Sequence, residues 1–180
     1  MVAIYPFQAL RPCPQRAAEI ACPPYDVMDR HEARMLAQGR PHSFLHVTRA
    51  DADFPDHVPE TSPQVYQKGR ETLDRFQEEG LLIQDAEPLL YIYRLVMDGR
   101  TQTGLVFTAS VDDYLSGKIK RHELTLKAKE LDRIRHFDVC NANTAPIYLT
   151  YYEVPQIRAL MTSWIQSHEP VADFVSIEGV

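Results

Sequence analysis

The sequence predicts an α+β fold, in which helices pack on a mixed, mainly antiparallel sheet. The first observation is a hairpin over residues 89–111, where Asp98-Gly99 separates two runs rich in β-branched and aromatic residues. This dipeptide favours a tight hairpin turn because both of its residues adopt positive φ readily. The second observation is a helix over residues 63–79, which begins with Ser62 at the N-cap and Pro63 at the first helical position.

The N-terminal residues alternate between extended and helical patterns. Residues 2–10 are predicted to form a strand or an extended arm. Residues 22–27 (CPPYDV) are predicted to form a rigid extended loop, because consecutive prolines fix φ and disfavour helix before them. Asp29 is expected to cap a helix over residues 30–38, and residues 43–48 are predicted to form a short strand.

The rest of the chain supplies the remaining predicted elements. Residues 51–61 are polar and acidic and are expected to form a mobile surface loop. The strand over residues 89–97 is apolar on both faces at its centre, which predicts a place inside a sheet. A strand over residues 146–152 and a helix over residues 155–168 follow. Residues 172–180 resemble one more strand, so we expect a longer polypeptide of which this chain is a part.

Length, composition and charge limit the class of protein. The chain has 180 residues, 44% hydrophobic and 24% charged, which suits a single globular domain over residues 1–180. The formal net charge of −6 argues against general binding to nucleic acid or to an anionic membrane. No apolar run is long enough to span a membrane, and the N-terminus does not resemble a signal peptide. Three cysteines without a C-x-x-C pair are expected to be reduced, as in a cytoplasmic protein.

The most distinctive chemistry lies in a helical pattern that follows Gly117. Polar residues recur there at steps of three and four, which would place them on one side of one helix: His122, Thr125, Lys129, Asp132 and His136. The opposite side, expected to pack on the core, holds Leu124, Ala128, Leu131 and Ile134. Residues 115–136 hold seven of the 19 Lys and Arg residues but only three of the 25 Asp and Glu residues. This charge segregation indicates an anion-binding surface, although ordinary solvated helix faces also carry charged stripes.

Several known site motifs are absent from the sequence. Neither G-x-x-x-x-G-K-[ST] nor G-x-G-x-x-G occurs, so a nucleotide would not be held by those glycine-rich loops. H-E-x-x-H and G-x-S-x-G are missing as well. His122 and His136 would lie about 21 Å apart along a continuous helix, so no metal site built from protein ligands alone is predicted.

The chain resembles the domain-of-unknown-function 1015 family of bacteria and archaea over almost its whole length. Five stretches in the expected order carry the resemblance: PFQALRP (6–12), CPPYDV (22–27), SVDDYLSGKIKRHELT (110–125), KELDRI (129–134) and NTAPIYLTYY (143–152). Residues 23–27 match the family's Pro-Pro-Tyr-Asp-Val loop. A His-Glu-x-Thr run and a following Asp-Arg pair are matched by His122, Glu123, Thr125, Asp132 and Arg133.

The resemblance implies a longer protein and a nucleotide-related activity. Family members are considerably longer and carry a later Asp-Gly-His-His-Arg motif, which no stretch of this chain matches. This chain would then be the N-terminal half of such a protein, with the C-terminal half as its partner. The shared motif is similar to one in ParB-like nucleotide-binding proteins, including free-serine kinases, and that analogy favours phosphotransfer.

We therefore predict a site for a small phosphorylated ligand or a nucleotide, used for phosphotransfer with ATP or ADP and Mg²⁺. Four residues would bind phosphate, three by charge and one by its hydroxyl group: Lys120, Lys129, Arg133 and Thr125. Positioning and charge neutralisation account for most catalysis of phosphoryl transfer, which suits such a set.

The remaining site residues would act on the bound phosphate or on their neighbours. His122 or Glu123 would serve as an acid–base or Mg²⁺-positioning group, and Asp26 would approach from the proline-rich loop. Tyr25 and Asp132 would orient the other groups.

Two alternatives remain open at this point. One is a ParB-like nucleic-acid-binding protein, against which stand the overall acidity and the lack of a helix-turn-helix signature. The other is a structural half-domain with no site of its own, in which the basic stripe packs against the C-terminal half through ion pairs.

Overall fold

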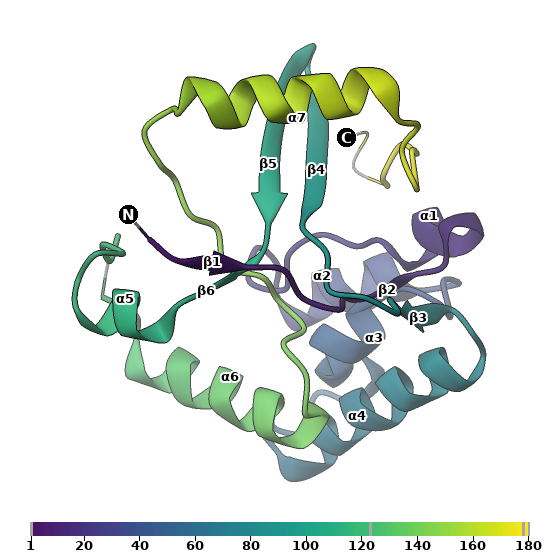
Figure 1. The fold of residues 1–180 in the computed structure, drawn as a ribbon. Helices are drawn as coiled ribbons and strands as arrows, with labels where there is room; N and C mark the ends of the chain where they lie inside the picture. Colours follow the sequence, from purple (N-terminus) through teal and green to yellow (C-terminus); the bar gives the residue numbers. More distant parts are fainter. Residues whose placement is uncertain (1, 123, 178, 180) are drawn as a thin grey trace.

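The computed structural model describes residues 2–122, 124–177 and 179, and its architecture is α+β (Figure 1). The helices are α1 (Ala17–Ile20), α2 (Arg30–Ala37), α3 (Leu45–Thr48), α4 (Pro63–Glu78), α5 (Val111–Leu115), α6 (Lys127–Cys140) and α7 (Pro155–Ser167), with 3-10 turns η1 (Pro14–Arg16) and η2 (Ala50–Asp53). The strands are β1 (Ile4–Tyr5), β2 (Leu10–Pro12), β3 (Leu82–Gln84), β4 (Tyr91–Met97), β5 (Arg100–Val106) and β6 (Thr108–Ala109).

All strand pairs in the described chain are antiparallel, but they form three separate two-stranded sheets. β1 pairs with β6, β2 with β3, and β4 with β5. The β4–β5 hairpin is the longest of them and is closed between Met97 and Arg100. Asp98 and Gly99 have φ of 51° and 73°, the positive values that a primed turn requires, so the predicted hairpin is confirmed.

Two predicted helices are also confirmed. Asp29 accepts a hydrogen bond from the Glu32 amide at 2.9 Å, while the Glu32 carboxylate accepts one from the Asp29 amide at 2.8 Å, which caps α2 reciprocally. α4 begins at Pro63 as predicted, although the Ser62 hydroxyl makes no capping hydrogen bond. The chain leaves α4 through Gly80, whose φ is 68°.

The core lies where α3, α4 and α6 meet. Its buried residues come from five segments of the chain: Ile20, Val47, Leu73, Phe76, Leu81, Leu82 and Cys140. α3 and α4 approach closely at Gly69, where an added Cβ atom would lie 2.8 Å from the Val47 carbonyl oxygen. Only glycine allows this approach, because heavier residues would push the Val47 carbonyl away.

One prediction for residues 43–61 is wrong, and a second holds only in part. Residues 45–48 form helix α3 rather than a strand, and its Leu45 and Val47 side chains are both fully buried. Residues 54–61 form a largely exposed loop as predicted, but residues 51–53 belong to η2, where Asp51 is buried. Arg30 and Arg34 on α2 explain the order of this segment, because their guanidinium groups donate hydrogen bonds to the carbonyl groups of Ala52, Phe54 and Val58.

The C-terminal part of the structure differs from the predictions in two further respects. β4 lies at the edge of a two-stranded ribbon rather than inside a sheet. Residues 146–152, and the described residues within 172–180, belong to no strand. Within the described residues, no helix is long and apolar enough to cross a membrane.

The helix in the basic segment is shorter than predicted and is oriented differently. α6 begins at Lys127, so His122 and Thr125 precede the helix instead of lying on it. The buried residues of α6 are His136 and Cys140, whereas Leu131 and Ile134, expected to face the core, are 44% and 48% exposed.

Candidate anion-binding site at helix α6

The start of α6 leaves several backbone donors free. Leu126 occupies the N-cap position, and no side chain caps the helix there. The first hydrogen bond of the helix runs from the Glu130 amide to the Leu126 carbonyl. The amides of the first helical turn therefore have no partner within α6, and they give this end of the helix a positive potential.

An open depression of about 420 Å³ lies beside this helix start. Its lining combines a hydroxyl group, two cations, two carboxylates and three largely apolar side chains: Thr125, Lys129, Arg133, Glu130, Asp138, Tyr25, Ile134 and Phe137. The charges of the lining balance, so recognition would depend on where each charge lies rather than on a net positive field.

Arg133 is held in place from two sides. Its Nε and Nη2 atoms donate to Oδ2 of Asp132 at 3.0 and 2.6 Å. The Tyr66 hydroxyl donates to the other oxygen of that carboxylate, Asp132 Oδ1, at 2.7 Å. Burial, together with this hydrogen bond, raises the pKa of Tyr66 to about 12, so the hydroxyl stays protonated and remains a donor. Asp132 therefore holds Arg133 in place, and Tyr66 holds Asp132 in place.

The remaining nitrogen of Arg133 has no hydrogen-bond partner. Nη1 is buried and unpaired within the described part of the chain. The guanidinium carbon lies 4.2 Å from the centroid of the Tyr25 ring, a distance typical of cation–π contact. A buried donor without an acceptor carries a free-energy penalty, which an anionic oxygen would remove once the side chains that cover Nη1 moved to admit it.

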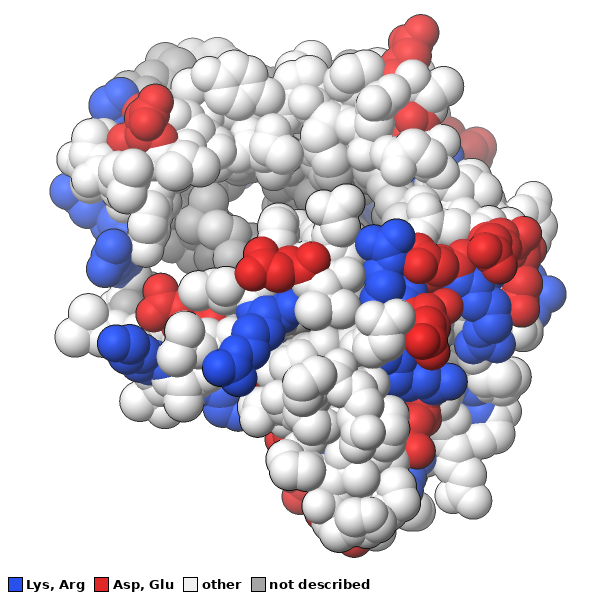
Figure 2. Space-filling model, turned by 90° about the horizontal axis from the view of Figure 1, so that it is seen from below, with Lys and Arg blue, Asp and Glu red and all other residues white. Residues whose placement is uncertain are grey.

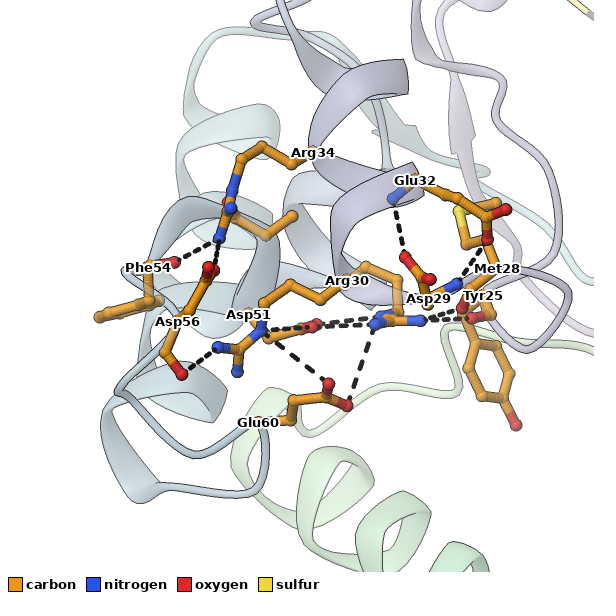
Figure 3. Close-up of polar contacts among 12 residues, drawn as sticks. Tyr25, Met28, Asp29, Arg30, Glu32, Arg34, Asp51, Phe54, Asp56 and Glu60 are labelled. Carbon is orange, nitrogen blue, oxygen red and sulfur yellow. Dashed lines mark hydrogen bonds and ion pairs between the residues drawn. The ribbon is translucent and has the colours of Figure 1, made fainter.

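The loop that carries Tyr25 is held by a buried ion pair. Arg49 Nη1 donates to the backbone carbonyl oxygens of Tyr25, at 3.1 Å, and of Met28. Arg49 in turn forms a bidentate pair with Asp51, at 3.0 and 2.9 Å. Arg30 approaches the same carboxylate at 3.4 Å (Figure 3). In this view the Tyr25 ring points away from the network and toward α6.

This network also determines the charge state of Asp51. Burial acts to raise the pKa of Asp51, but the hydrogen bonds and charge of Arg49 and Arg30 outweigh burial and bring that pKa below its usual value. Burial raises the pKa of Tyr25, against the opposing charge of Arg133. The carboxylate is therefore ionised and the Tyr25 phenol neutral near pH 7.

His136, predicted to share the polar stripe, has a structural role instead. It is 5% exposed, and its Nε2 atom donates to the Val47 carbonyl oxygen at 2.9 Å. Its Nδ1 atom lies 3.4 Å from the Thr144 hydroxyl. Burial lowers the pKa of His136, although the bond to Val47 opposes the shift. The neutral ring thus joins α6 to α3.

The structure brings some of the predicted site residues together and not others. Tyr25, Thr125, Lys129 and Arg133 line one depression, and Asp132 braces Arg133 from outside it. Three others are exposed and lie outside its lining: Asp26, Lys120 and His122. Glu123 lies outside the described residues.

The residues that position the site were missed at the sequence level. Arg49, Asp51 and Tyr66 contact the loop or Asp132 from segments distant in sequence. Arg49 and Asp51 flank Ala50 in a stretch without helical or strand periodicity, so no pattern indicated their burial.

A second open depression, of about 410 Å³, lies near the start of α2. Its one guanidinium group, from Arg30, already donates to Val58 and Asp51. The lining otherwise includes three carboxylates: Asp29, Asp56 and Glu60. This depression is therefore a poorer candidate for binding an anion.

The face seen from below the view of Figure 1 shows no broad basic surface. Lys and Arg side chains are interspersed there with Asp and Glu side chains (Figure 2). Such a mixture gives little attraction for a long polyanion, whose binding depends on many adjacent phosphate contacts.

Comparisons with known proteins give one match. A family described as "Protein of unknown function (DUF1015)" matches residues 4–180. No curated protein and no solved structure matches the chain.

Proposed function

The chain belongs to the DUF1015 family, which spans nearly its whole length, and from this premise we propose that the depression beside α6 binds a small phosphorylated ligand. A nucleotide such as ATP or ADP is the ligand that the lining suits best, and phosphotransfer is the use that we propose for it. The observation that carries the proposal is the unpartnered Nη1 atom of Arg133.

Arg133 supports phosphate binding because its geometry is set before any ligand arrives. Asp132 and the Tyr25 ring hold the guanidinium, so binding would cost little side-chain entropy. Asp132 also neutralises much of its charge, so Arg133 would contribute a directed hydrogen bond more than a long-range attraction. Lys129, which is exposed and has no ion-pair partner among the described residues, would supply that attraction.

The apolar part of the lining supports a nucleotide over free phosphate. Phe137 and Ile134 line the depression, and the two residues are 50% and 48% exposed overall. A flat heterocycle could lie against them while its phosphate groups meet Lys129 and the free amides at the start of α6. Inorganic phosphate would contact only Lys129 and the amides at the start of α6.

Catalysis needs an acid–base group near the phosphate. His122, one of the two residues predicted for this role, lies outside the lining, as does Asp26; Glu123, the other, lies outside the described residues. Phosphotransfer through either residue would therefore require a movement that brings His122 or Asp26 to the ligand. Glu130 and Asp138 are the carboxylates already present.

The described residues fit Mg²⁺ only as a companion of the ligand. No group of three or more His, Cys, Asp or Glu residues in this part of the chain could hold a metal ion. Mg²⁺ keeps several waters and is commonly bound through one or two carboxylates and substrate phosphates. Glu130 or Asp138 could supply such a carboxylate.

The test is a binding comparison among three variants. Lys129→Ala and Arg133→Gln alter the depression, whereas Lys127→Ala removes an exposed charge of the same helix outside the lining. Calorimetry with ATP, ADP, pyrophosphate and inorganic phosphate should show at least a tenfold loss of affinity in the first two variants, because a charge-assisted hydrogen bond contributes about 1.5–3 kcal/mol. The Lys127→Ala variant should bind as the wild type does.

Two outcomes would contradict the proposal. One is a failure of the binding comparison: either no phosphate compound binds the wild-type chain, or all three variants lose affinity equally. The other is salt-sensitive binding to duplex DNA that the same substitutions abolish, which would support the nucleic-acid alternative.

A further inference from the structure

The described chain exposes far more surface than a folded chain of its size normally does. Its accessible surface is 13037 Å². A compact monomer of 20.7 kDa exposes about 8,900 Å². The excess of about 4,000 Å² on one chain is larger than one partner's half of the roughly 2,000–5,000 Å² that obligate interfaces bury in total, so it can accommodate such an interface.

Much of the exposed apolar surface comes from β4 and from residues 147–177. More than half of the exposed large apolar side chains in the described residues belong to these segments or to Leu89 and Leu90 before β4. Tyr152 is 98% exposed, and Leu160 on α7 is 71% exposed. Isolated exposed apolar residues are ordinary, but a collection on neighbouring segments marks a binding surface.

These segments have little structural support of their own. β4 pairs with β5 on one side and with no described strand on the other. α7, the yellow-green helix at the top of Figure 1, buries a single residue, Met161. The Gln102 amide donates to the Tyr148 hydroxyl at 2.7 Å and so joins the hairpin to the segment before α7. A two-stranded ribbon is marginally stable by itself, so a third strand or a packed partner would stabilise it.

The charge of this surface favours association with protein. Residues 89–109 and 146–177 contain three arginines, four carboxylates and no lysine. This is about half the charge density of the whole chain, of which 24% is charged. Depletion of Lys, Asp and Glu and enrichment of aromatic residues are typical of interface cores.

We propose that a second copy of this chain covers this surface in a twofold dimer. The open edge of β4 is self-complementary under a twofold axis, because two identical edges can pair antiparallel and form a four-stranded sheet. The surface is also nearly neutral, so two copies meet without strong repulsion. Each chain carries an excess of the same size, and an isologous interface removes equal areas from both.

Solution mass and hydrogen exchange test the proposal on the whole 180-residue chain. At micromolar concentration, sedimentation or light scattering should give twice the 20.7 kDa of one chain. Tyr152→Asp with Leu160→Asp should yield monomer, because both side chains are exposed in one chain and would be buried between two. Leu115→Asp is the matched control, since Leu115 is 72% exposed on α5, away from the surface, and it should stay dimeric.

Wild-type chain alone provides a second readout that needs no variant. Dilution into the nanomolar range should release the protection of β4 amides from hydrogen exchange, while the amides of α4 keep theirs. A wild-type chain that is monomeric at micromolar concentration overturns the proposal, even if another polypeptide binds the surface. The proposal is also overturned if the Tyr152→Asp/Leu160→Asp variant remains dimeric, or if the protection of the β4 amides from exchange does not change on dilution.

Discussion

Arg133 lies over the ring of Tyr25, with its guanidinium carbon 4.2 Å from the ring centroid. This contact joins α6 to the proline-rich loop at residues 22–27, and both residues line the same depression. The carboxylate of Asp132 holds the guanidinium from a second direction. The site is thus assembled from two segments that meet at one side chain, and the predictions below test how they depend on each other.

Two substitutions of Tyr25 distinguish the contribution of its ring to ligand binding from the contribution of its hydroxyl group. Tyr25→Leu removes the cation–π contact and should weaken binding of a phosphate ligand about threefold to tenfold, because such contacts contribute about 0.5–1 kcal/mol or more. Tyr25→Phe keeps the ring and should bind nearly as the wild type does. Calorimetric titration checks both. Equal losses in the two variants would assign the effect to the hydroxyl group instead.

Asp51→Asn should loosen the loop that carries Tyr25. The substitution removes the charge that pairs with Arg49, whose side chain is 11% exposed, and leaves a buried guanidinium without its counterion. We expect a loss of about 2–3 kcal/mol in the free energy of unfolding. Amides of residues 25–28 should also exchange faster. Asp56→Asn, at an exposed carboxylate, is the control and should cost little.

Gly69→Ala should destabilise the contact between α3 and α4. The new methyl group would lie 2.8 Å from the Val47 carbonyl oxygen, so the helices must separate. The expected cost is about 1–3 kcal/mol, which exceeds the gain in helix propensity from alanine. Urea denaturation measures it. Gly104→Ala on β5 meets no atom within 4 Å and serves as the comparison; an equal loss there would rule out the steric explanation.

His136 should make stability depend on pH below about 6.5. Burial chiefly lowers its folded-state pKa, so below the unfolded value of 6.5 the unfolded chain binds a proton that the folded chain does not. The contribution is complete above pH 6.5 and is lost as the pH falls, by at most about 1.4 kcal/mol per pH unit. Denaturation of wild type and His136→Gln at one protein concentration should show this slope only in the wild type.

His46 provides an internal check on that assignment. Its hydrogen bond with Asp53 raises its folded-state pKa, so its contribution is fully present below pH 6.5 and is lost as the pH rises through the raised value. His46 therefore adds no slope in the window where His136 titrates. A His136→Gln variant that keeps the full acid slope would contradict the prediction.

The elements that sequence reasoning predicted well are those determined by near neighbours in the chain. Asp98-Gly99 forms the hairpin turn, and Asp29 caps α2 through a residue three positions away. The buried residues of α4 follow a period near 3.6, because one face of a long helix must pack on the core. The turn and the cap depend on interactions within about one helical turn, and the buried face of α4 follows from a repeat that is visible along the sequence.

The predictions failed where contacts with segments distant in sequence determine which residues are buried. The period of α6 predicted a buried side with Leu131 and Ile134, but the helix buries His136 and Cys140 instead. The Val47 carbonyl needs a donor and Gly69 leaves room for a ring, and these two features select His136 over Ile134 for the core. Residues 51–61 read as a loop because the arginines that order them lie on α2.

The candidate site was partly accessible from sequence. The spacing of Thr125, Lys129 and Arg133 placed them near one another, and the family resemblance added Tyr25; all four line the depression. The Arg49–Asp51 pair that holds the loop carries no recognisable motif, because its function depends on two backbone carbonyl groups that only the folded chain brings near.

The single tryptophan, Trp164, lies on α7, where its ring stacks on His168 with centroids 3.8 Å apart and an angle of 5° between the planes. The core between α3, α4 and α6 has no such fluorophore. Fluorescence melting curves will therefore report the unfolding of α7. Circular dichroism will report mainly the unfolding of the other helices, which include α4 and α6. Transitions that do not coincide would reveal that this protein loses its two regions in separate steps.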